Sequence, residues 1–114
     1  MPHDLKKSVW DAWNACQLIL EFIKGHSLET YRQNARDRSA VERQFIVLGE
    51  AFNRISEIDP SFRDRFSEMG DAIGMRNHIA HGYDRVSDEV IWFTAVESVP
   101  VLMDKLSALL DNNA

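Results

Sequence analysis

The sequence predicts an all-α protein: a four-helix bundle that runs mostly up and down and is joined by short helices. Apolar residues recur at spacings of three and four in several long stretches, which is the period of an amphipathic helix. Serine, aspartate, glycine and proline lie where such helices would begin and end. No stretch alternates apolar and polar residues as a strand does, and no linker divides the 114 residues. We therefore expect one helical domain over residues 1–114.

The first part of the chain predicts one long and one short helix. The long helix begins at Asp4, which can cap it, and runs to about Lys24, before Gly25. Its inward stripe consists of apolar residues at helical spacing: Leu5, Val9, Trp13, Cys16, Leu20 and Ile23. The short helix runs from a cap at Ser27 to about Gln33.

The second long helix begins near Asp37 and stops before Asp59 and Pro60. Its inward stripe is again apolar: Val41, Phe45, Leu48, Phe52 and Ile55. Asp59 and Pro60 suit the cap and first position of a further short helix. Glu50 faces away from the stripe with an arginine within helical reach on either side. This pattern predicts a solvated ion pair rather than a catalytic carboxylate.

The last long helix begins at Ser87 or Asp88. Its inward stripe continues almost to the end of the chain: Ile91, Ala95, Val99, Leu102, Leu106 and Leu109. Pro100 interrupts it, because proline lacks the N–H that bonds to the carbonyl four residues earlier. Since the apolar pattern continues on both sides, we expect a kink rather than an end.

Composition narrows the classes of partner. The net charge is −5, so the chain lacks the basic face needed to coat nucleic acid, and any contact with RNA should be local; no DNA partner is expected. Cys16 is the only cysteine, which suits a reducing compartment. No signal peptide and no span of membrane length is present, so a cytoplasmic protein without a membrane partner is expected.

The chemistry of the chain is concentrated in residues 74–83. A helix that begins at Ser67 and ends at Gly82 forms one apolar stripe at about 100° per residue. The stripe consists of Met69, Ala72, Ile73, Ile79 and Ala80. Arg76 falls in the middle of it. A guanidinium keeps its proton, so it must meet a carboxylate, a set of carbonyls or a ligand anion such as phosphate.

The neighbouring sector of this helix predicts a groove made by Gly70, Gly74, Asn77 and His81. Each glycine inside a helix costs about 0.5 to 1 kcal/mol relative to alanine. Two of them together indicate either the close approach of a backbone or ligand, or helix packing alone. Arg76 and His81 are about 140° apart around the axis. Either the arginine curls around the helix, or a second chain completes the site.

Histidine beside arginine favours phosphate chemistry over a metal site. His78 and His81 could both ligate a metal, but no Glu or Cys completes a set around them, so neither metal nor cofactor is expected. An imidazole can move a proton, and a guanidinium can hold phosphate oxygens as charge develops. RNA supplies its own nucleophile, the 2′-hydroxyl. One His81 cannot be acid and base in the same step, whereas a symmetric dimer supplies two. The residue types alone leave open whether this phosphate site cuts RNA.

The same residues resemble a known family. The run Arg76-Asn77-x-x-x-His81-Gly82-Tyr83, after a helix that contains Gly49-Glu50-Ala51, is similar to the signature of HEPN domains. Nearly the whole chain resembles the HepT-type toxins of HEPN/MNT toxin–antitoxin pairs, including the late helix interrupted by proline. The resemblance implies a homodimeric, metal-independent endoribonuclease toxin.

The resemblance also implies roles for individual residues. Arg76 and His81 would be catalytic, and Asn77 would support them. An MNT-type nucleotidyltransferase antitoxin would transfer AMP to Tyr83 and silence the toxin. Asp84-Arg85 follows Tyr83, where relatives often have an aromatic residue or a glycine, so the resemblance does not define the antitoxin docking surface.

Two other functions remain open from the sequence. The chain could be a non-catalytic HEPN module that binds nucleotide or RNA for a partner nucleotidyltransferase. It could also be a helical dimerisation scaffold in which Arg76 is a satisfied interface residue. Growth arrest on expression would support only the toxin.

Overall fold

The computed structural model of the protein describes residues 1–82 and 86–112, except for the side chain of residue 112. Within this part there are seven α-helices and no strand. The helices are α1 (His3–Ile23), α2 (Leu28–Gln33), α3 (Ala35–Ile58), α4 (Phe62–Arg65), α5 (Glu68–His81), α6 (Asp88–Glu97) and α7 (Val99–Asn112).

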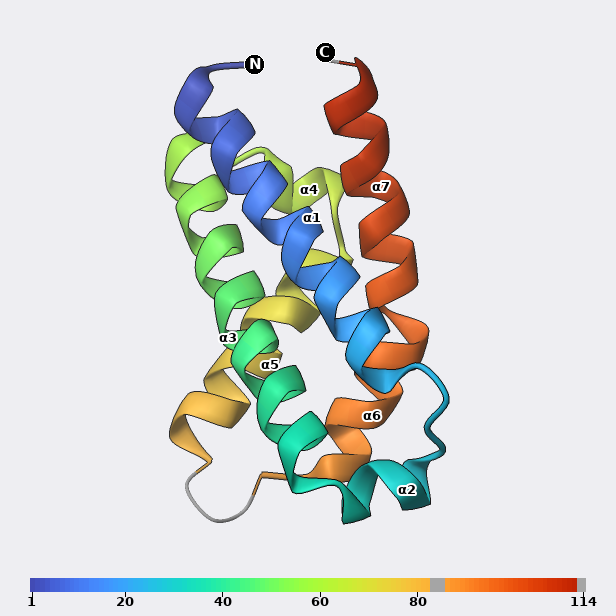
Figure 1. The fold of residues 1–114 in the computed structure, drawn as a ribbon. Helices are drawn as coiled ribbons and strands as arrows, with labels where there is room; N and C mark the ends of the chain where they lie inside the picture. Colours follow the sequence, from blue (N-terminus) through green and yellow to red (C-terminus); the bar gives the residue numbers. More distant parts are fainter. Residues whose placement is uncertain (83–85, 113–114) are drawn as a thin grey trace.

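The long helices form an up-and-down bundle, as predicted (Figure 1). α1 and α5 run in one direction, while α3 and the α6–α7 pair run in the other. The short helices α2 and α4 lie in the connections before and after α3. α1 packs against α3 and α7, and α3 packs against α5. This arrangement places α5 beside α3.

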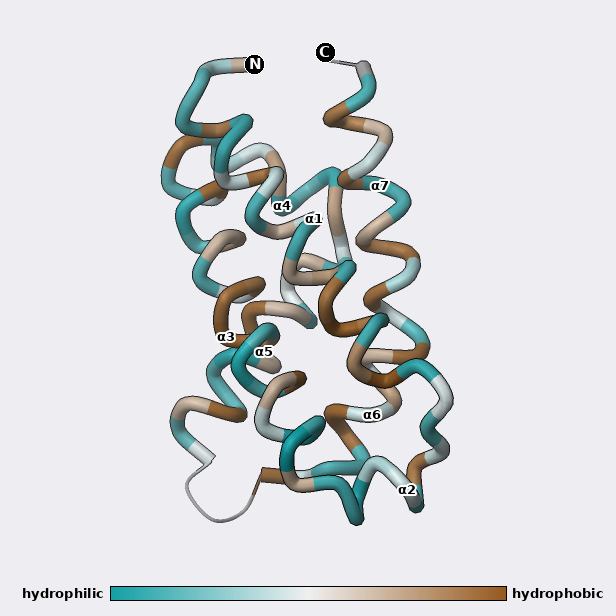
Figure 2. Tube along the Cα trace, in the orientation of Figure 1, coloured by the Kyte–Doolittle hydropathy of each residue, from teal (hydrophilic) through white to brown (hydrophobic). Residues whose placement is uncertain are grey.

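One hydrophobic core holds the bundle together. Apolar and polar segments alternate along each long helix, so every helix buries one side (Figure 2). The largest fully buried side chains on the long helices include Val9, Ile19, Phe45, Leu48, Phe52, Ile55, Met69 and Leu106. Full burial of such a side chain contributes roughly 1.5 to 3 kcal/mol. In the stripes predicted for α1 and for α6–α7, three residues are only partly buried at the edge of this core: Trp13, Leu20 and Leu109.

The predicted ends of the first helices are right at Ser27 and wrong at Asp4. Pro2, not Asp4, holds the N-cap position of α1, and Asp4 lies inside the first turn. At this position the negative carboxylate of Asp4 still interacts favourably with the positive end of the helix dipole. The Ser27 hydroxyl accepts a hydrogen bond from the N–H of Thr30, and Thr30 Oγ1 accepts one from the Ser27 N–H, which completes a capping box.

Two helix starts differ from prediction because of hydrogen bonds made by side chains just before the helix. Asn34 Oδ1 accepts the N–H of Asp37 at 2.9 Å, so α3 begins two residues earlier than Asp37. Asp59 Oδ1 accepts the N–H of Ser61 at 3.1 Å and its hydroxyl at 2.6 Å. This turn makes Ser61, rather than Asp59, the residue before α4.

The last predicted helix is divided into two. Ser87 caps α6 as expected, and its hydroxyl accepts the N–H of Val90 at 3.2 Å. α6 ends at Glu97 and α7 begins at Val99, so Pro100 lies in the first turn of a new helix. Proline is tolerated there because the first turn has unpaired N–H groups in any case. Pro100 therefore interrupts the helix more completely than the predicted kink.

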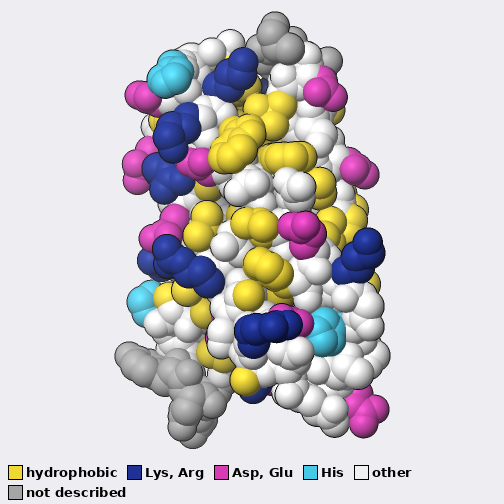
Figure 3. Space-filling view, viewed as in Figure 1, with side chains coloured by type: hydrophobic (Ala, Val, Ile, Leu, Met, Phe, Trp, Pro, Cys, Tyr) yellow, Lys and Arg dark blue, Asp and Glu magenta, His cyan; other side chains and the backbone are white. Residues whose placement is uncertain are grey.

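The surface matches the mixed composition. Basic and acidic side chains are interspersed on the face shown in Figure 3, which therefore presents no continuous basic surface. Of the helices in the described part of the chain, none is long and apolar enough to span a membrane. The Cys16 thiol is buried in the core, and burial raises its pKa to about 12.

Candidate functional site

Helix α5 carries the candidate site and has two different sides. Its buried residues are Met69, Ala72, Ile73 and Met75. The stripe predicted from the sequence is therefore right at three positions. It is wrong at Ala80, which is exposed, while Ile79 is partly buried. The opposite side exposes the predicted groove residues: Gly70, Gly74, Asn77 and His81.

Arg76 lies where α5 approaches α3. A Cβ added at Gly49 of α3 would lie 2.7 Å from Cγ of Arg76 and 3.3 Å from the carbonyl oxygen of Ala72. It would also overlap the Arg76 Cβ. Gly49 is therefore the residue that lets the arginine stem pass directly over α3. In the sequence, Gly49 stands out only as part of the Gly49-Glu50-Ala51 motif. Its position beside Leu48 in the apolar stripe was the available signal of a close helix contact.

The head of Arg76 has few partners. Its Nη1 donates to Oδ1 of Asn77 at 3.1 Å. Its Nε is buried and has no hydrogen-bond partner among the described residues. No carboxylate in the described part of the chain pairs with the guanidinium. A structural arginine at this depth is normally paired with an acid, so the charge of Arg76 is available to a ligand anion.

His81 lies at the C-terminal end of α5 and is exposed. It has no hydrogen-bond partner among the described residues. Arg76 and His81 belong to one uninterrupted helix, so the angle of about 140° between them persists. The fold therefore does not aim the two side chains at one point within a single chain.

The end of α5 depends on Gly82 and His78. Gly82 has a right-handed backbone, not the left-handed one common at helix ends. A Cβ there would overlap the carbonyl oxygen of His78 and lie 3.1 Å from Cγ2 of Val86, which explains the glycine. The N–H of Ser87 donates to Nε2 of His78 at 3.1 Å. His78 thus ties α5 to the start of α6. Tyr83, the predicted modification site, lies outside the described residues.

The hollow beside this helix differs from the predicted groove. A cleft of about 500 Å³ lies between α5 and α6. Its lining consists of Gly70, Asp71, Gly74, Met75, His78, Val90, Thr94 and Ser98. It shares both glycines with the predicted groove, but Asn77 and His81 lie outside its lining. The reason is that α6 closes only one side of the exposed face of α5.

Other candidate groups take different places. Glu50 is exposed, and Arg54 pairs with Asp11 of α1 at 3.5 Å instead of with Glu50. The predicted Glu50 ion pair is therefore wrong for this arginine. Among the described residues, no three His, Cys, Asp or Glu side chains are grouped closely enough to hold a metal ion.

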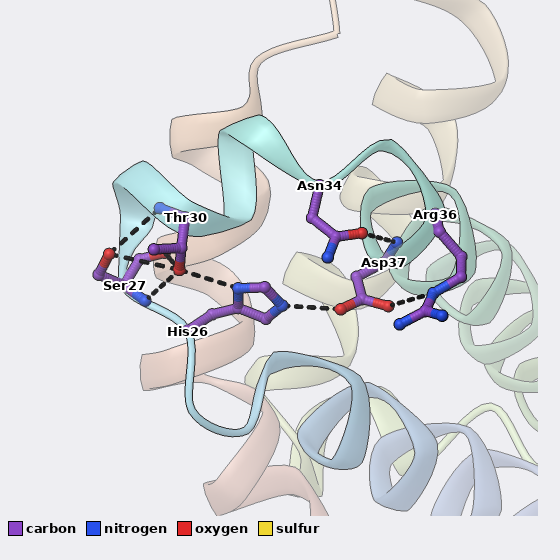
Figure 4. A network of polar contacts seen from close by, with 6 residues as sticks. All are labelled: His26, Ser27, Thr30, Asn34, Arg36 and Asp37. Atoms are coloured by element: carbon purple, nitrogen blue, oxygen red, sulfur yellow. Dashed lines mark hydrogen bonds and ion pairs between the residues drawn. The ribbon is translucent and has the colours of Figure 1, made fainter.

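Another histidine, His26, lies in a polar network at the start of α3 (Figure 4). Its Nδ1 lies 2.9 Å from Oγ1 of Thr30, and its Nε2 lies 2.7 Å from Oδ2 of Asp37. The hydrogen bond from His26, followed by one from Arg36, holds the pKa of Asp37 below its usual range. Every side chain here has a partner within the chain. The network fastens the connection after α1 to the beginning of α3.

Comparison with known proteins relates this chain to ribonucleases. The model of the family described as "Ribonuclease HepT-like" matches residues 13–109. A "Putative RNase" of Caldanaerobacter subterraneus subsp. tengcongensis is 27% identical over 97 residues, which is 83% of this chain and 84% of that protein. A "Putative RNase" of Methanocaldococcus jannaschii is 27% identical over 99 residues, which is 85% of this chain and 88% of that protein.

A third relative carries the family name itself. The "Probable ribonuclease HepT" of Thermococcus cleftensis is 28% identical over 111 residues, which is 96% of this chain and 98% of that protein. A search of solved structures found no significant match. The family match covers α3, α5 and the candidate site. The chain belongs to the HepT-like ribonuclease family.

Proposed function

We propose that this protein is a metal-independent endoribonuclease and the toxin of a toxin–antitoxin pair. The observation that carries the proposal is the guanidinium of Arg76, held at the crossing of two helices without a carboxylate partner among the described residues. Such a cation suits a phosphoryl group that gains charge in a transition state. An exposed imidazole lies on the same helix at His81. Membership of a ribonuclease family agrees with both.

The reaction uses the 2′-hydroxyl of RNA as nucleophile. One His81 removes the 2′-hydroxyl proton, and the 2′-oxygen attacks the adjacent phosphorus. The bond from phosphorus to the 5′-oxygen breaks, and a protonated imidazole gives that oxygen its proton. The products are a 2′,3′-cyclic phosphate and a 5′-hydroxyl. Arg76 binds the phosphate oxygens throughout, and Asn77 orients the guanidinium through its hydrogen bond.

The site needs two copies of the chain. Acid and base are required in the same step, and His81 and Arg76 point about 140° apart on one helix. A homodimer that pairs the exposed faces of two α5 helices supplies the second imidazole. A Cβ at Gly70 or Gly74 would meet none of the described residues within 4 Å. These glycines therefore leave room for a partner helix, and α6 adds Val90 and Phe93, which are 49% and 45% exposed.

The same proposal includes a protein partner. An MNT-type nucleotidyltransferase antitoxin would attach AMP to Tyr83, two residues beyond His81. The adenylate phosphate is negative and would compete with the RNA phosphate for Arg76. A cytoplasmic location suits this system and a single buried cysteine.

One observation favours a second function. A catalytic histidine is usually oriented by another group, and His81 has no such partner among the described residues. That arrangement would suit a non-catalytic HEPN module that binds nucleotide or RNA for the nucleotidyltransferase. Such a module would keep the affinity of Arg76 for phosphate but would not cut RNA.

Incubation of the purified protein with total RNA distinguishes the two functions. The endoribonuclease yields fragments with 2′,3′-cyclic phosphate ends at equal rates with and without EDTA. The Arg76→Ala variant, purified in parallel, controls for contaminating nucleases. Binding without fragments would support the non-catalytic module, and cleavage that EDTA stops would overturn the metal-independent mechanism.

A further inference from the structure

The contact between Gly49 and Arg76 has a specific geometry. The atoms that a Gly49 side chain would meet are Cβ and Cγ of the arginine, the part of its stem nearest the backbone. These atoms cannot swing aside by a rotamer change at the tip. Relief therefore requires α5 to move away from α3 or the whole arginine side chain to leave its place.

The head of Arg76 depends on that stem. Its Nε is buried at the crossing, and only Nη1 has a hydrogen-bond partner among the described residues, namely Asn77 on the same helix. No described group on another helix holds the guanidinium from outside. The position of the charge is therefore set by how closely α5 lies on α3.

We infer that Gly49 is a positioning residue for the reaction: its missing side chain fixes the closeness of α3 and α5 and thereby the place of the Arg76 guanidinium. This inference rests on the proposed function, in which Arg76 binds the phosphate. Gly49 itself touches no substrate. A glycine is needed at position 49 for lack of space and not for backbone conformation, because Gly49 is buried in α3 and has ordinary helical dihedral angles.

The kinetic test compares Gly49→Ala with a control on the same helix. Gly49→Ala should lower kcat for RNA cleavage by roughly 10- to 100-fold, because small displacements of a charge-stabilising group reduce rates steeply. Val41→Ala truncates a fully buried residue of α3 and leaves the crossing unchanged, so its kcat should stay within about twofold of the wild type. Full activity of folded Gly49→Ala would overturn the inference.

Double variants separate positioning from simple loss of stability. Gly49→Ala in an Arg76→Gly background should cause no further loss of rate, because the guanidinium and the overlapping Cβ and Cγ are then both absent. Additive losses would contradict this. Should Gly49→Ala fail to fold, the exchange Gly49→Ala with Arg76→Gly should recover a cooperative unfolding transition, because it removes the overlapping stem. If the exchange is no better folded than Gly49→Ala alone, the contact is not the reason for the glycine.

A spectroscopic test works even if the wild type cuts no RNA. The Nε–H resonance of Arg76 can be assigned in a ¹⁵N spectrum by its loss in Arg76→Ala. It should shift in Gly49→Ala and stay in place in Val41→Ala. A shift without RNA cleavage by the wild type would refute the ribonuclease proposal and keep the positioning role. An unmoved resonance would refute the positioning role alone.

Discussion

The start of α3 and the end of α5 lie at the same end of the bundle (Figure 1), and each has a histidine nearby, but the two histidines have different surroundings. At the start of α3, His26 has a partner on each ring nitrogen, and Asp37 is held by His26, Arg36 and the cap of Asn34 (Figure 4). At the end of α5, His81 has no partner among the described residues, and Arg76 keeps a buried Nε without one. The His26 imidazole is held by hydrogen bonds within the chain, whereas the His81 imidazole is exposed and open to a substrate. This difference supports the proposal that places catalysis at His81 rather than at His26.

The largest expected effect tests that assignment directly. His81→Ala and Arg76→Ala should each reduce RNA cleavage by about 10²- to 10⁴-fold while leaving the fold intact, since general acid–base catalysis and charge stabilisation are worth that much. His26→Ala is the matched histidine control and should keep the rate. Initial rates on a fluorescent RNA and circular dichroism measure both. A rate lost in His26→Ala but kept in His81→Ala would reverse the comparison.

The next effect concerns the exposed side of α5. If the proposed dimer forms, Gly74→Leu should convert it to a monomer and lower activity by at least about tenfold, because the new side chain would occupy the space proposed for the partner helix. The fold itself should accommodate the leucine, since none of the residues that the structure describes lies within 4 Å of a Cβ added at Gly74. Ala108→Leu, on an exposed position of α7, is the control. Light scattering at micromolar concentration measures the mass, and a wild-type monomer with full activity would exclude a shared site.

The third prediction tests whether Tyr83 is the residue that the proposed antitoxin modifies. Tyr83→Phe should cleave RNA within about twofold of the wild-type rate, since the phenol takes no part in the chemistry. It should nevertheless escape neutralisation by the cognate nucleotidyltransferase. Mass spectrometry after incubation with that enzyme and ATP should find adenylate on the wild type and none on the variant. Adenylate on another residue, or neutralisation without any, would indicate occlusion by the bound antitoxin.

The smallest effect belongs to the structural region. The folded pKa of Asp37 lies below its usual value, so its contribution to stability is present above that value and is lost as pH falls through the folded pKa. Asp37→Asn should therefore lower the thermal midpoint by a few degrees at pH 7, and the difference should shrink towards pH 3. Asp104→Asn, an exposed carboxylate on α7, should change little at either pH. A difference that grows on acidification would contradict the network of Figure 4.

Much of the fold could be predicted because apolar spacing is a local property. The stripes of α1, α3 and α6–α7 match the core at nearly every position, since a helix with one apolar side has only one side to bury. The boundaries were harder to predict because a helix start depends on local hydrogen bonds that several nearby polar residues can make. Asn34 caps α3 by accepting the N–H of Asp37, and before α4 the Asp59 carboxylate accepts hydrogen bonds from Ser61 in a turn that delays the helix.

The site divides in the same way. The placement of Arg76 near an apolar stripe, and of Gly70, Gly74, Asn77 and His81 on one exposed side, follows from helical angles and was available from the sequence. The sequence did not show which neighbouring helices cover α5. Only the packing of α6 puts the cleft beside His78 rather than His81.

Periodicity along the chain thus determined which residues share a side of a helix. The tertiary structure decided what meets that side, because contacts between helices depend on residues distant in sequence. Arg76 illustrates both contributions. The spacing of apolar residues in its own segment places it among them. The space that admits its stem comes from Gly49, 27 positions earlier, on a helix that only the folded bundle brings against it.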